Sequence, residues 1–495
     1  MFRLLILIIF LLAVLSRFLY FPEDLYFAFD QARDGFKSLE VVNGDIKIIG
    51  PPSAASDKIF AGPLIYYIFG PIYFLGNNNP EVVSAFLRVW NSLGVFLVIG
   101  IGWILFNKWV GFLAGFFYAI SYEASQYSLF LSHQPMASVT VLLFYLGLAL
   151  FIFKKIQWGL TLSFLGLGLS IQFHFVYTLL MVVLILFFII FKKHYQFSLK
   201  HIFYAVTIFL ITSSTFILAE AKFQFRFLRT FFEGGGFKFY PQAATYSMKR
   251  FLHDNILASD VLLWIVGLLL TGALIYFLKK KEVKFPIIFL MVWFLVGVSP
   301  YLLSGTNSYY YSAAANVSLL LFISYVIYYL LSTKILLALL ILIAVSVNNL
   351  YLIINNNPKG VNREFIIQPG MLLTSEKLVL DYIYQKAQGR FFAVNGLTVP
   401  LGVNTTWSYL FEWYGQQKYG YLPVWGMEVA LGFPGHLKVE TKRSNLPDKR
   451  FTILEPTVGI RDVDIKKFFQ EENFFSKVVE EKKFGTIAVQ YRQRI

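Results

Sequence analysis

The sequence predicts a membrane protein of the all-α class, with about eleven transmembrane helices, a long first outer loop and a small C-terminal soluble α+β domain. Three observations predict this class. Hydrophobic residues make up 57% of the 495 residues, and charged residues only 14%, whereas soluble domains are about 25% charged. The apolar residues gather in runs long enough to cross a bilayer. The chain after about residue 355 contains no such run.

Composition excludes several functions. The formal net charge is +15, but the basic residues lie mostly in short loops between apolar runs. That pattern follows the positive-inside rule and argues against a nucleic-acid surface. The chain has no cysteine, which excludes disulfides, thiolate catalysis and Cys-ligated zinc.

Eleven runs approach the roughly 20 apolar residues that a helix needs to cross a bilayer. The first follows Arg3 and has no small-x-small cleavage site after it, so we expect an uncleaved first span and not a signal peptide. The expected spans are residues 4–20, 83–106, 109–122, 135–153, 158–172, 175–191, 202–219, 259–278, 285–303, 312–331 and 334–353.

The loops between these runs predict the orientation. The short loops at residues 122–134, 170–173 and 304–308 contain no Lys or Arg. The alternate loops hold the lysines, which places them and the N-terminus in the cytoplasm and the C-terminal domain outside. Heavy use of Phe, Tyr, Ile, Lys and Asn is typical of an AT-rich prokaryotic genome, so we expect a prokaryotic plasma (inner) membrane. The lysines are Lys108, Lys154, Lys155, Lys192, Lys193, Lys200, Lys279, Lys280, Lys281, Lys284 and Lys334.

Three outer segments are long. The first, residues 21–82, ends in an apolar and aromatic stretch at 62–76 that is short for a span and suits a re-entrant or interfacial helix. The second, residues 220–258, contains three consecutive glycines at 234–236. The third is the tail, and we expect two domains, a catalytic membrane domain at residues 1–355 and an extracytoplasmic domain at 356–495.

The tail alternates helical and extended patterns. Helices are expected at 375–388, 406–418 and 464–472, because apolar residues recur on one face and Gly389 follows the first as a stop signal. Strands are expected at 390–395 and 452–455. Residues 476–483 and 486–491 alternate around Gly485, which predicts a hairpin.

The polar residues favour an enzyme. Ionisable groups near the spans all lie towards the outer face, and they are Arg88, His133, His174 and Glu220. A proton-coupled transporter would place carboxylates near the midplane of the membrane. Polar groups crowded at one interface suit a membrane enzyme that acts on a lipid headgroup.

Residues 29–35 are the densest polar group. If they are helical, Asp30 and Asp34 share a face, because they are four residues apart. A carboxylate beside a low-dielectric interface can act as a general base on a hydroxyl. The same spacing also fits a helix cap with a pair on a solvated helix.

Five cations are expected on the outer side, where positive charge is otherwise avoided, and guanidinium and ammonium groups suit phosphate oxygens. The cations are Arg33, Lys58, Arg88, Arg226 and Arg229. Arg226 and Arg229 could equally reach out to lipid phosphates.

Four further residues complete the set of candidates, and they are His133, Gln134, His174 and Tyr310. His133, beside Gln134, and His174 could be ligands or acid–base groups, or structural hydrogen bonders. Tyr310, within a run of three tyrosines, could face the site or belong to the interfacial aromatic belt.

Several motifs carry a family resemblance. Asp30-Gln31-Ala32-Arg33-Asp34-Gly35 and residues 49–52 and 62–67 resemble the first outer loop of GT-C glycosyltransferases. The resemblance is to the bacterial branch similar to protein O-mannosyltransferases and the aminoarabinose lipid A transferase. Residues 127–135 are similar to the segment before that branch's fourth span, and residues 172–175 and 219–223 match in order and spacing. The resemblance covers residues 1–355.

The resemblance implies an outward-facing cavity and a polyprenyl-phosphate-linked sugar as donor. It places the catalytic acid early in the first outer loop, at Asp30. Asp30 would deprotonate an acceptor hydroxyl as that hydroxyl attacks the anomeric carbon, with inversion. Cationic residues or a metal would stabilise the departing polyprenyl phosphate.

The sequence departs from the family pattern in two places. The residue after Asp30 is Gln31, where the family has an acid, and His133-Gln134 stand where many members carry an acid. Asp34 is the candidate for the second carboxylate. A divalent metal is compatible with the sequence but is not required by it.

Two other functions stay open beside a hexosyl- or pentosyltransferase. One is a transporter or flippase of a lipid-linked substrate. The other is a non-catalytic scaffold with the tail as binding module. The acceptor could be a protein, a glycan or a lipid.

Overall fold

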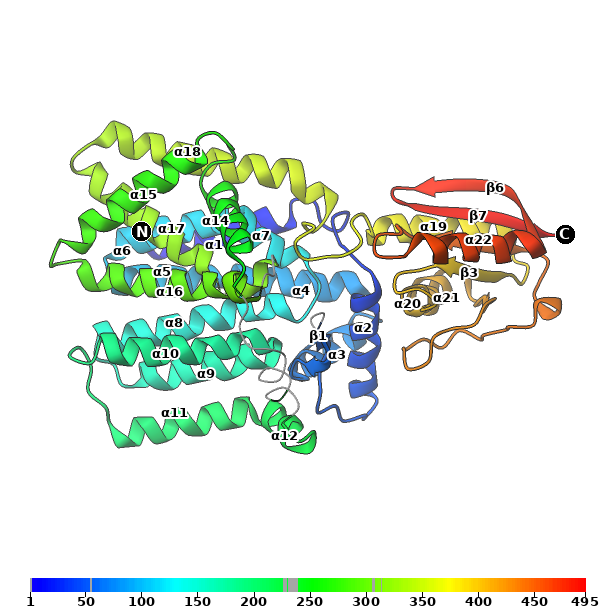
Figure 1. Cartoon of the computed structure of the whole chain (residues 1–495), viewed down its shortest axis with the longest axis horizontal. Coiled ribbons are helices and arrows are strands. Elements are labelled where there is room, and N and C mark those ends of the chain that lie inside the picture. The colour runs from blue at the N-terminus through cyan, green and yellow to red at the C-terminus, as the bar shows by residue number, and fades with distance from the viewer. Residues whose placement is uncertain (1, 54–55, 226–228, 230–238, 305–307, 313) are drawn as a thin grey trace.

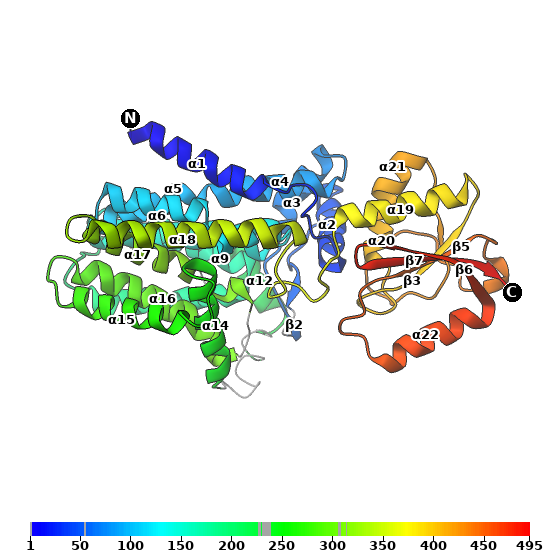
Figure 2. The ribbon, with the colours of Figure 1, turned by 90° about the horizontal axis from the view of Figure 1, so that it is seen from above.

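The structure, a computed structural model, describes residues 2–53, 56–225, 229, 239–304, 308–312 and 314–495. Figures 1 and 2 show a bundle of helices along the long axis of the molecule and a smaller α/β part at one end. The N-terminus and the loop between α10 and α11 lie at the opposite end of the bundle (Figure 1).

A helix lies within each of the eleven predicted apolar segments. Two segments are interrupted: the second after α4, and the seventh between α11 and α12, which bend by 60°. The helices are α1 (Phe2–Phe18), α4 (Pro80–Ser92) with α5 (Gly94–Leu105), α6 (Lys108–Ala119), α8 (Ala137–Phe153), α9 (Trp158–Phe173), α10 (Leu179–Ile190), α11 (Leu199–Thr212) with α12 (Ser214–Lys222), α15 (Leu263–Leu278), α16 (Lys284–Ser304), α17 (Ala315–Leu331) and α18 (Ile335–Asn356).

The number of spans is not confirmed. Among the described residues, four helical stretches are long and apolar enough to cross a membrane, or five if the bent pair counts as one span. A helix of 12 residues such as α10 is roughly 18 Å long, shorter than the roughly 30 Å hydrocarbon core. The four stretches are Pro80–Leu105, Gln134–Phe153, Lys284–Leu303 and Ile335–Lys359.

Glycines allow the bundle helices to pack closely. A Cβ on Gly147 of α8 would lie 2.5 Å from the backbone nitrogen of Ser163 on α9, and a Cβ on Gly159 would lie 2.5 Å from the Gly147 carbonyl oxygen. Small residues at such contacts let membrane helices approach to backbone distance.

The first outer loop folds into α2 (Phe29–Val42), a short antiparallel pair of β1 (Pro52–Ser53) and β2 (Ser56–Phe60), and α3 (Leu64–Leu75). The helix expected at 62–76 is therefore confirmed. The loop packs on the end of α9, because a Cβ on Gly62 would lie 1.9 Å from Oε1 of Gln172.

Shorter elements join the helices near the α/β part. They are α7 (Tyr122–Leu129), η1 (Gln134–Met136), η2 (Phe175–Thr178), α14 (Pro241–Asn255), η3 (Tyr309–Ser312) and η4 (Asn357–Lys359). The sequence analysis did not predict α14, which packs against α16 and α18.

The tail forms a five-stranded mixed sheet in the order β4-β3-β5-β7-β6. The expected first helix, last helix and hairpin are confirmed, whereas the parallel pairing of β3 with β4 and β5 was not predicted. The elements are α19 (Leu373–Ala387), β3 (Ala393–Leu397), α20 (Thr405–Leu410), the π-helical turn η5 (Phe411–Gly415), α21 (Gln416–Tyr419), β4 (Val424–Trp425), η6 (Arg443–Asn445), β5 (Arg450–Leu454), α22 (Asp462–Phe475), β6 (Ser476–Phe484) and β7 (Ile487–Arg494).

The tail is joined to the first outer loop by backbone hydrogen bonds. The Phe27 amide donates to the Met371 carbonyl at 3.0 Å, and the Leu373 amide donates to the Leu25 carbonyl at 2.9 Å. The tail thus packs beside α2, the helix that carries Asp30.

Burial of Glu376 in the tail predicts a stability that depends on pH. Glu376 is fully buried, and neither carboxyl oxygen has a hydrogen-bond partner. Burial, followed by the nearby Glu455, raises the pKa of Glu376 well above its usual value. The folded state therefore keeps a proton that the unfolded state loses above about pH 4.3, so stability falls as the pH rises.

Glu376→Gln should remove this pH-dependent loss of stability. The free energy of unfolding should rise by roughly 1–3 kcal/mol at pH 8, with a smaller effect at pH 4.5. Thermal unfolding at the two pH values measures the difference, and the exposed Glu428→Gln is the matched control. The same gain at both pH values would contradict the prediction.

Candidate active site

One arginine joins both candidate carboxylates at the start of α2. Arg33 Nη1 lies 2.6 Å from Asp30 Oδ1, and Arg33 Nη2 lies 2.8 Å from Asp34 Oδ1. The Asp30 side chain is 57% exposed, whereas the Asp34 side chain is only 7% exposed. The expected helical pair is confirmed, and its two acids differ: one faces outwards and one is enclosed.

Gln31 has a structural role that accounts for the missing acid. Its Oε1 accepts from the Ala28 amide at 3.1 Å at the beginning of α2, and its Nε2 donates to the Leu131 carbonyl at 3.0 Å. Gln31 therefore caps α2 and fixes it to the segment before η1. A carboxylate could accept the first hydrogen bond but could not donate the second.

Two residues distant in sequence lie next to Asp34, and two more follow in a chain of ring contacts. The Tyr66 hydroxyl lies 3.5 Å from Asp34 Oδ1, and His133 Nδ1 lies 4.0 Å from Asp34 Oδ2. The His133 ring stacks on His174 with 6.0 Å between centroids, and the Tyr310 ring lies 5.2 Å from His174. The structure therefore brings together six residues singled out from the sequence, which we call the Asp34 cluster: Asp30, Arg33, Asp34, His133, His174 and Tyr310.

Burial sets the charges in this cluster. It raises the pKa of Asp34 to about 6, although the Arg33 charge opposes the shift. Burial, with smaller effects from His174 and Arg33, lowers the pKa of His133 well below its usual value. At neutral pH, His133 is uncharged, Asp34 is mostly ionised, and Arg33 faces two carboxylates.

Other candidates lie elsewhere. Gln134 contacts Ser132, whose Oγ donates to Gln134 Oε1 at 2.5 Å. Glu220, on α12, lines a cavity of about 120 Å³ next to β2. Arg229 is exposed, while Arg226 and the side chain of Lys58 lie outside the described residues.

The expectation that Arg88 binds the donor phosphate is wrong. Its side chain is fully buried, and its Nη2 lies 2.7 Å from Asp24 Oδ1. The guanidinium also donates to the Arg17 carbonyl. Arg88 therefore fixes α4 to the chain that follows α1 and is not open to a donor phosphate. The pairing was not predicted, because Asp24 and Arg88 lie 64 residues apart in the sequence.

A polar group on α14 was also missed. Arg250 Nη2 donates to the Tyr301 hydroxyl at 3.0 Å, and Asp254 accepts from the Tyr309 hydroxyl. The spacing of Arg250 and Asp254 is a helical signal, but the segment around them carries no continuous apolar face. No group of three or more His, Asp or Glu residues within the described ranges is placed to hold a metal ion.

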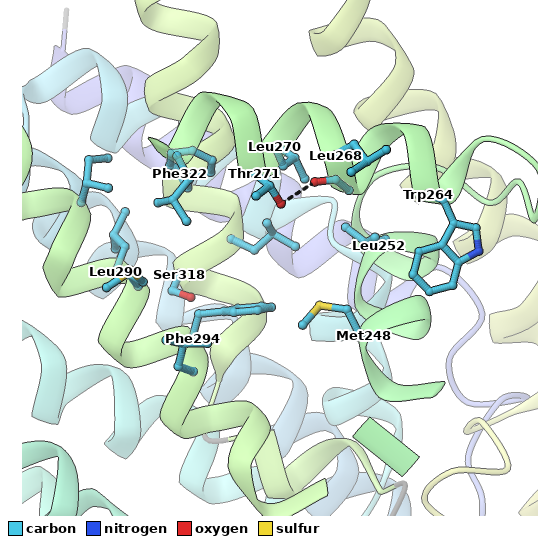
Figure 3. Close-up of a pocket in the computed structure, with 16 residues that line it drawn as sticks. Met248, Leu252, Trp264, Leu268, Leu270, Thr271, Leu290, Phe294, Ser318 and Phe322 are labelled. Carbon is cyan, nitrogen blue, oxygen red and sulfur yellow. Dashed lines mark hydrogen bonds between the residues drawn. The ribbon is translucent and has the colours of Figure 1, made fainter. Parts of the chain in front are cut away.

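An apolar cavity of about 430 Å³ opens between α14, α15, α16 and α17. Figure 3 shows Met248, Leu252 and Trp264 near one end and Leu290 and Phe322 near the other. Its few polar groups include Thr271, whose hydroxyl donates to the Gly267 carbonyl at 2.8 Å, and Ser318. Such a lining suits a hydrocarbon chain.

Comparison with solved structures shows that this chain, a bundle of apolar helices with a small α/β part, has the fold of ArnT. ArnT from Cupriavidus metallidurans bound to undecaprenyl phosphate aligns over 98% of this chain and 97% of its own, with a TM-score of 0.61 and 10% identity. The apo structure of the same protein aligns over 98% of this chain and 97% of its own, with a TM-score of 0.61 and 11% identity.

A second protein shares the fold more distantly. The apo oligosaccharyltransferase from Archaeoglobus fulgidus aligns over 85% of this chain and 64% of its own, with a TM-score of 0.50 and 13% identity. No family model and no curated protein matches the sequence. The resemblance drawn from the motifs is confirmed at the level of the fold.

The cluster predicts how the Asp34 carboxyl titrates. Arg33→Gln should raise the pKa of Asp34 above about 6, because the Arg33 charge lowers it. The carboxyl band in infrared difference spectra, identified by its loss in Asp34→Asn, follows the titration. Lys37→Gln is the control, since Lys37 pairs with Glu40 instead. An unchanged or lower pKa in Arg33→Gln would contradict the geometry.

Proposed function

We propose that this protein is a membrane glycosyltransferase that moves a sugar from a polyprenyl-phosphate donor to an acceptor hydroxyl on the outer face of the membrane. The observation that carries the proposal is Asp30, an exposed carboxylate fixed by Arg33 over the buried Asp34 in an ArnT-like fold. The solved ArnT structure holds undecaprenyl phosphate, and we assign the same class of donor here.

Asp30 acts as the general base. It takes the proton of the acceptor hydroxyl while that oxygen attacks the anomeric carbon. The bond between this carbon and the phosphate oxygen breaks, and the polyprenyl phosphate leaves with the electron pair. Attack opposite the leaving group inverts the anomeric centre. Arg33 holds Asp30 in one geometry, which lowers the entropic cost of the step.

The leaving phosphate needs a cation other than Arg33. Two carboxylates already balance the Arg33 charge, so this residue positions the base. We propose Arg229, which is exposed, together with Lys58 and Arg226. Their charge would stabilise the phosphate as the bond breaks.

The apolar cavity in Figure 3 supports a lipid substrate. We propose that it holds part of the polyprenyl chain. Burying isoprenoid carbons against side chains such as Leu290 and Phe294 contributes about 0.8 kcal/mol per CH₂. We propose that the protein itself lies in the prokaryotic inner membrane, with residues 356–495 as an outer domain and the N-terminus in the cytoplasm.

Asp30→Asn should lower the rate of sugar transfer by about 10²–10⁴-fold, the contribution of a positioned base. Because the Asp30 side chain is largely exposed, the melting temperature should change little. Mass spectrometry of products from a panel of polyprenyl-phosphate sugars measures transfer. Asp45→Asn, also exposed on this loop, should keep wild-type activity. Full activity in Asp30→Asn would remove Asp30 from the mechanism.

Thr271→Phe should fill part of the apolar cavity and raise the KM for a long-chain donor about tenfold, the loss of roughly two buried CH₂ groups. A donor with only two isoprene units should be affected less. Leu269→Phe is the control, because Leu269 is exposed on the same helix and does not line the cavity. An equal rise in KM for both donors would exclude the apolar cavity as a site for the polyprenyl chain.

A further inference from the structure

A further cavity, of about 300 Å³, lies beside α14, and none of the residues of the Asp34 cluster lines it. We call it the α14 cavity. Three parts of the chain form it: α14, η3, and the segment that leads from α18 to the tail. Each residue that lines it carries a polar or charged group, and these residues are Tyr246, Lys249, Arg250, His253, Asp254, Tyr309, Asn362 and Glu364.

The floor of the α14 cavity is buried and fixed. Arg250, Asp254 and Tyr309 are at most 7% exposed. The Arg250 guanidinium lies 4.0 Å from the centre of the Tyr309 ring, and Phe365 stacks parallel to that ring at 5.0 Å. Polar groups held this firmly are preorganised for a ligand, which lowers the entropic cost of binding.

The rim of the cavity is more open. The Tyr246 hydroxyl donates to Glu364 Oε1 at 2.6 Å. Lys249 pairs with Asp260 at 2.7 Å, and His253 Nδ1 lies 2.8 Å from Asp254 Oδ1. Tyr246 and Lys249 reach solvent, so a ligand can enter from outside.

The charges of the lining select the class of ligand. Two basic residues, Lys249 and Arg250, and two acidic residues, Asp254 and Glu364, line the cavity. His253 lies beside Asp254, and Asp260 outside the lining pairs with Lys249. A phosphate would face two carboxylates, and a cation would face two positive groups. A neutral ligand rich in hydroxyls meets donors and acceptors together, because carboxylates accept from its hydroxyl groups while the amide and cationic groups donate to its oxygens.

We propose that the α14 cavity binds a neutral saccharide, the glycan part of the acceptor. The assignment to the acceptor rests on the proposed function. The placement suits it, because Tyr309 lines the cavity while its chain neighbour Tyr310 contacts His174 of the Asp34 cluster. Consecutive Cα atoms are about 3.8 Å apart, so η3 places a residue that lines the cavity directly beside a residue that contacts the Asp34 cluster.

Saturation-transfer NMR on the full-length protein in nanodiscs tests the cavity, with methyl glucoside, methyl mannoside and methyl galactoside as probes. At least one should bind. Glu364→Gln and Tyr246→Phe should weaken that binding, about tenfold for Glu364→Gln, the loss of a hydrogen bond to a charged group. Both lie at the rim, which protects the fold. Gln242→Ala, exposed in the first turn of α14, should leave binding unchanged.

Three results would overturn the saccharide site: no binding of any glycoside, binding that neither rim variant weakens, or displacement of the glycoside by equimolar inorganic phosphate. Asp30→Asn separates this inference from the proposed function, because it should lower transfer by about 10²–10⁴-fold and keep glycoside binding. If no donor supports transfer while binding still depends on Glu364, the transferase proposal fails and the saccharide site stands. If transfer occurs and neither rim variant weakens glycoside binding, the saccharide site fails and the transferase proposal stands.

Discussion

The backbone pairing between the first outer loop and the tail is the constraint on which the arrangement depends. Residues 25–27 and 371–373 exchange hydrogen bonds, so α2 lies between the bundle and the α/β part. The Tyr409 hydroxyl also donates to the Asn78 carbonyl at 2.7 Å. Gly35 is required at this contact, because a Cβ there would lie 2.8 Å from the Tyr409 ring. These contacts hold α2, the helix that carries Asp30, against the tail.

Within this arrangement, the two carboxylates of α2 differ in their surroundings. Asp34 is enclosed by Tyr66, His133 and Arg33, while Asp30 shares the same arginine but faces outwards. A buried charge must be paired to be tolerated, and Arg33 supplies the pair. The Asp30 side chain is largely exposed, so a hydroxyl can reach it, as a general base requires.

The sequence predicted the local elements better than their contacts. Apolar run lengths located helices in all eleven segments, and alternation around Gly485 located the hairpin, because both signals are local. The parallel pairing of β3 with β5 depends on contacts between distant residues, which no periodicity carries. The count of spans also stays a prediction, because several helices are shorter than a bilayer is thick.

The same distinction holds for the site. Asp30, Arg33 and Asp34 lie within one helical turn, so their spacing was informative. His133, His174 and Tyr310 were singled out only by their position near the outer ends of spans, and the fold brings them together. Arg88 was misassigned because its partner Asp24 lies 64 residues away, and Arg250 was missed because α14 has no continuous apolar face.

The short turn η3 couples two places that would otherwise be independent. Tyr309 and Tyr310 are adjacent in the chain and face different neighbours, with Asp254 on one side and His174 on the other. The backbone of η3 therefore joins a residue that lines the α14 cavity to a residue that contacts His174. A ligand that moved the Tyr309 ring would act on the same short turn that sets the position of Tyr310 against the imidazole.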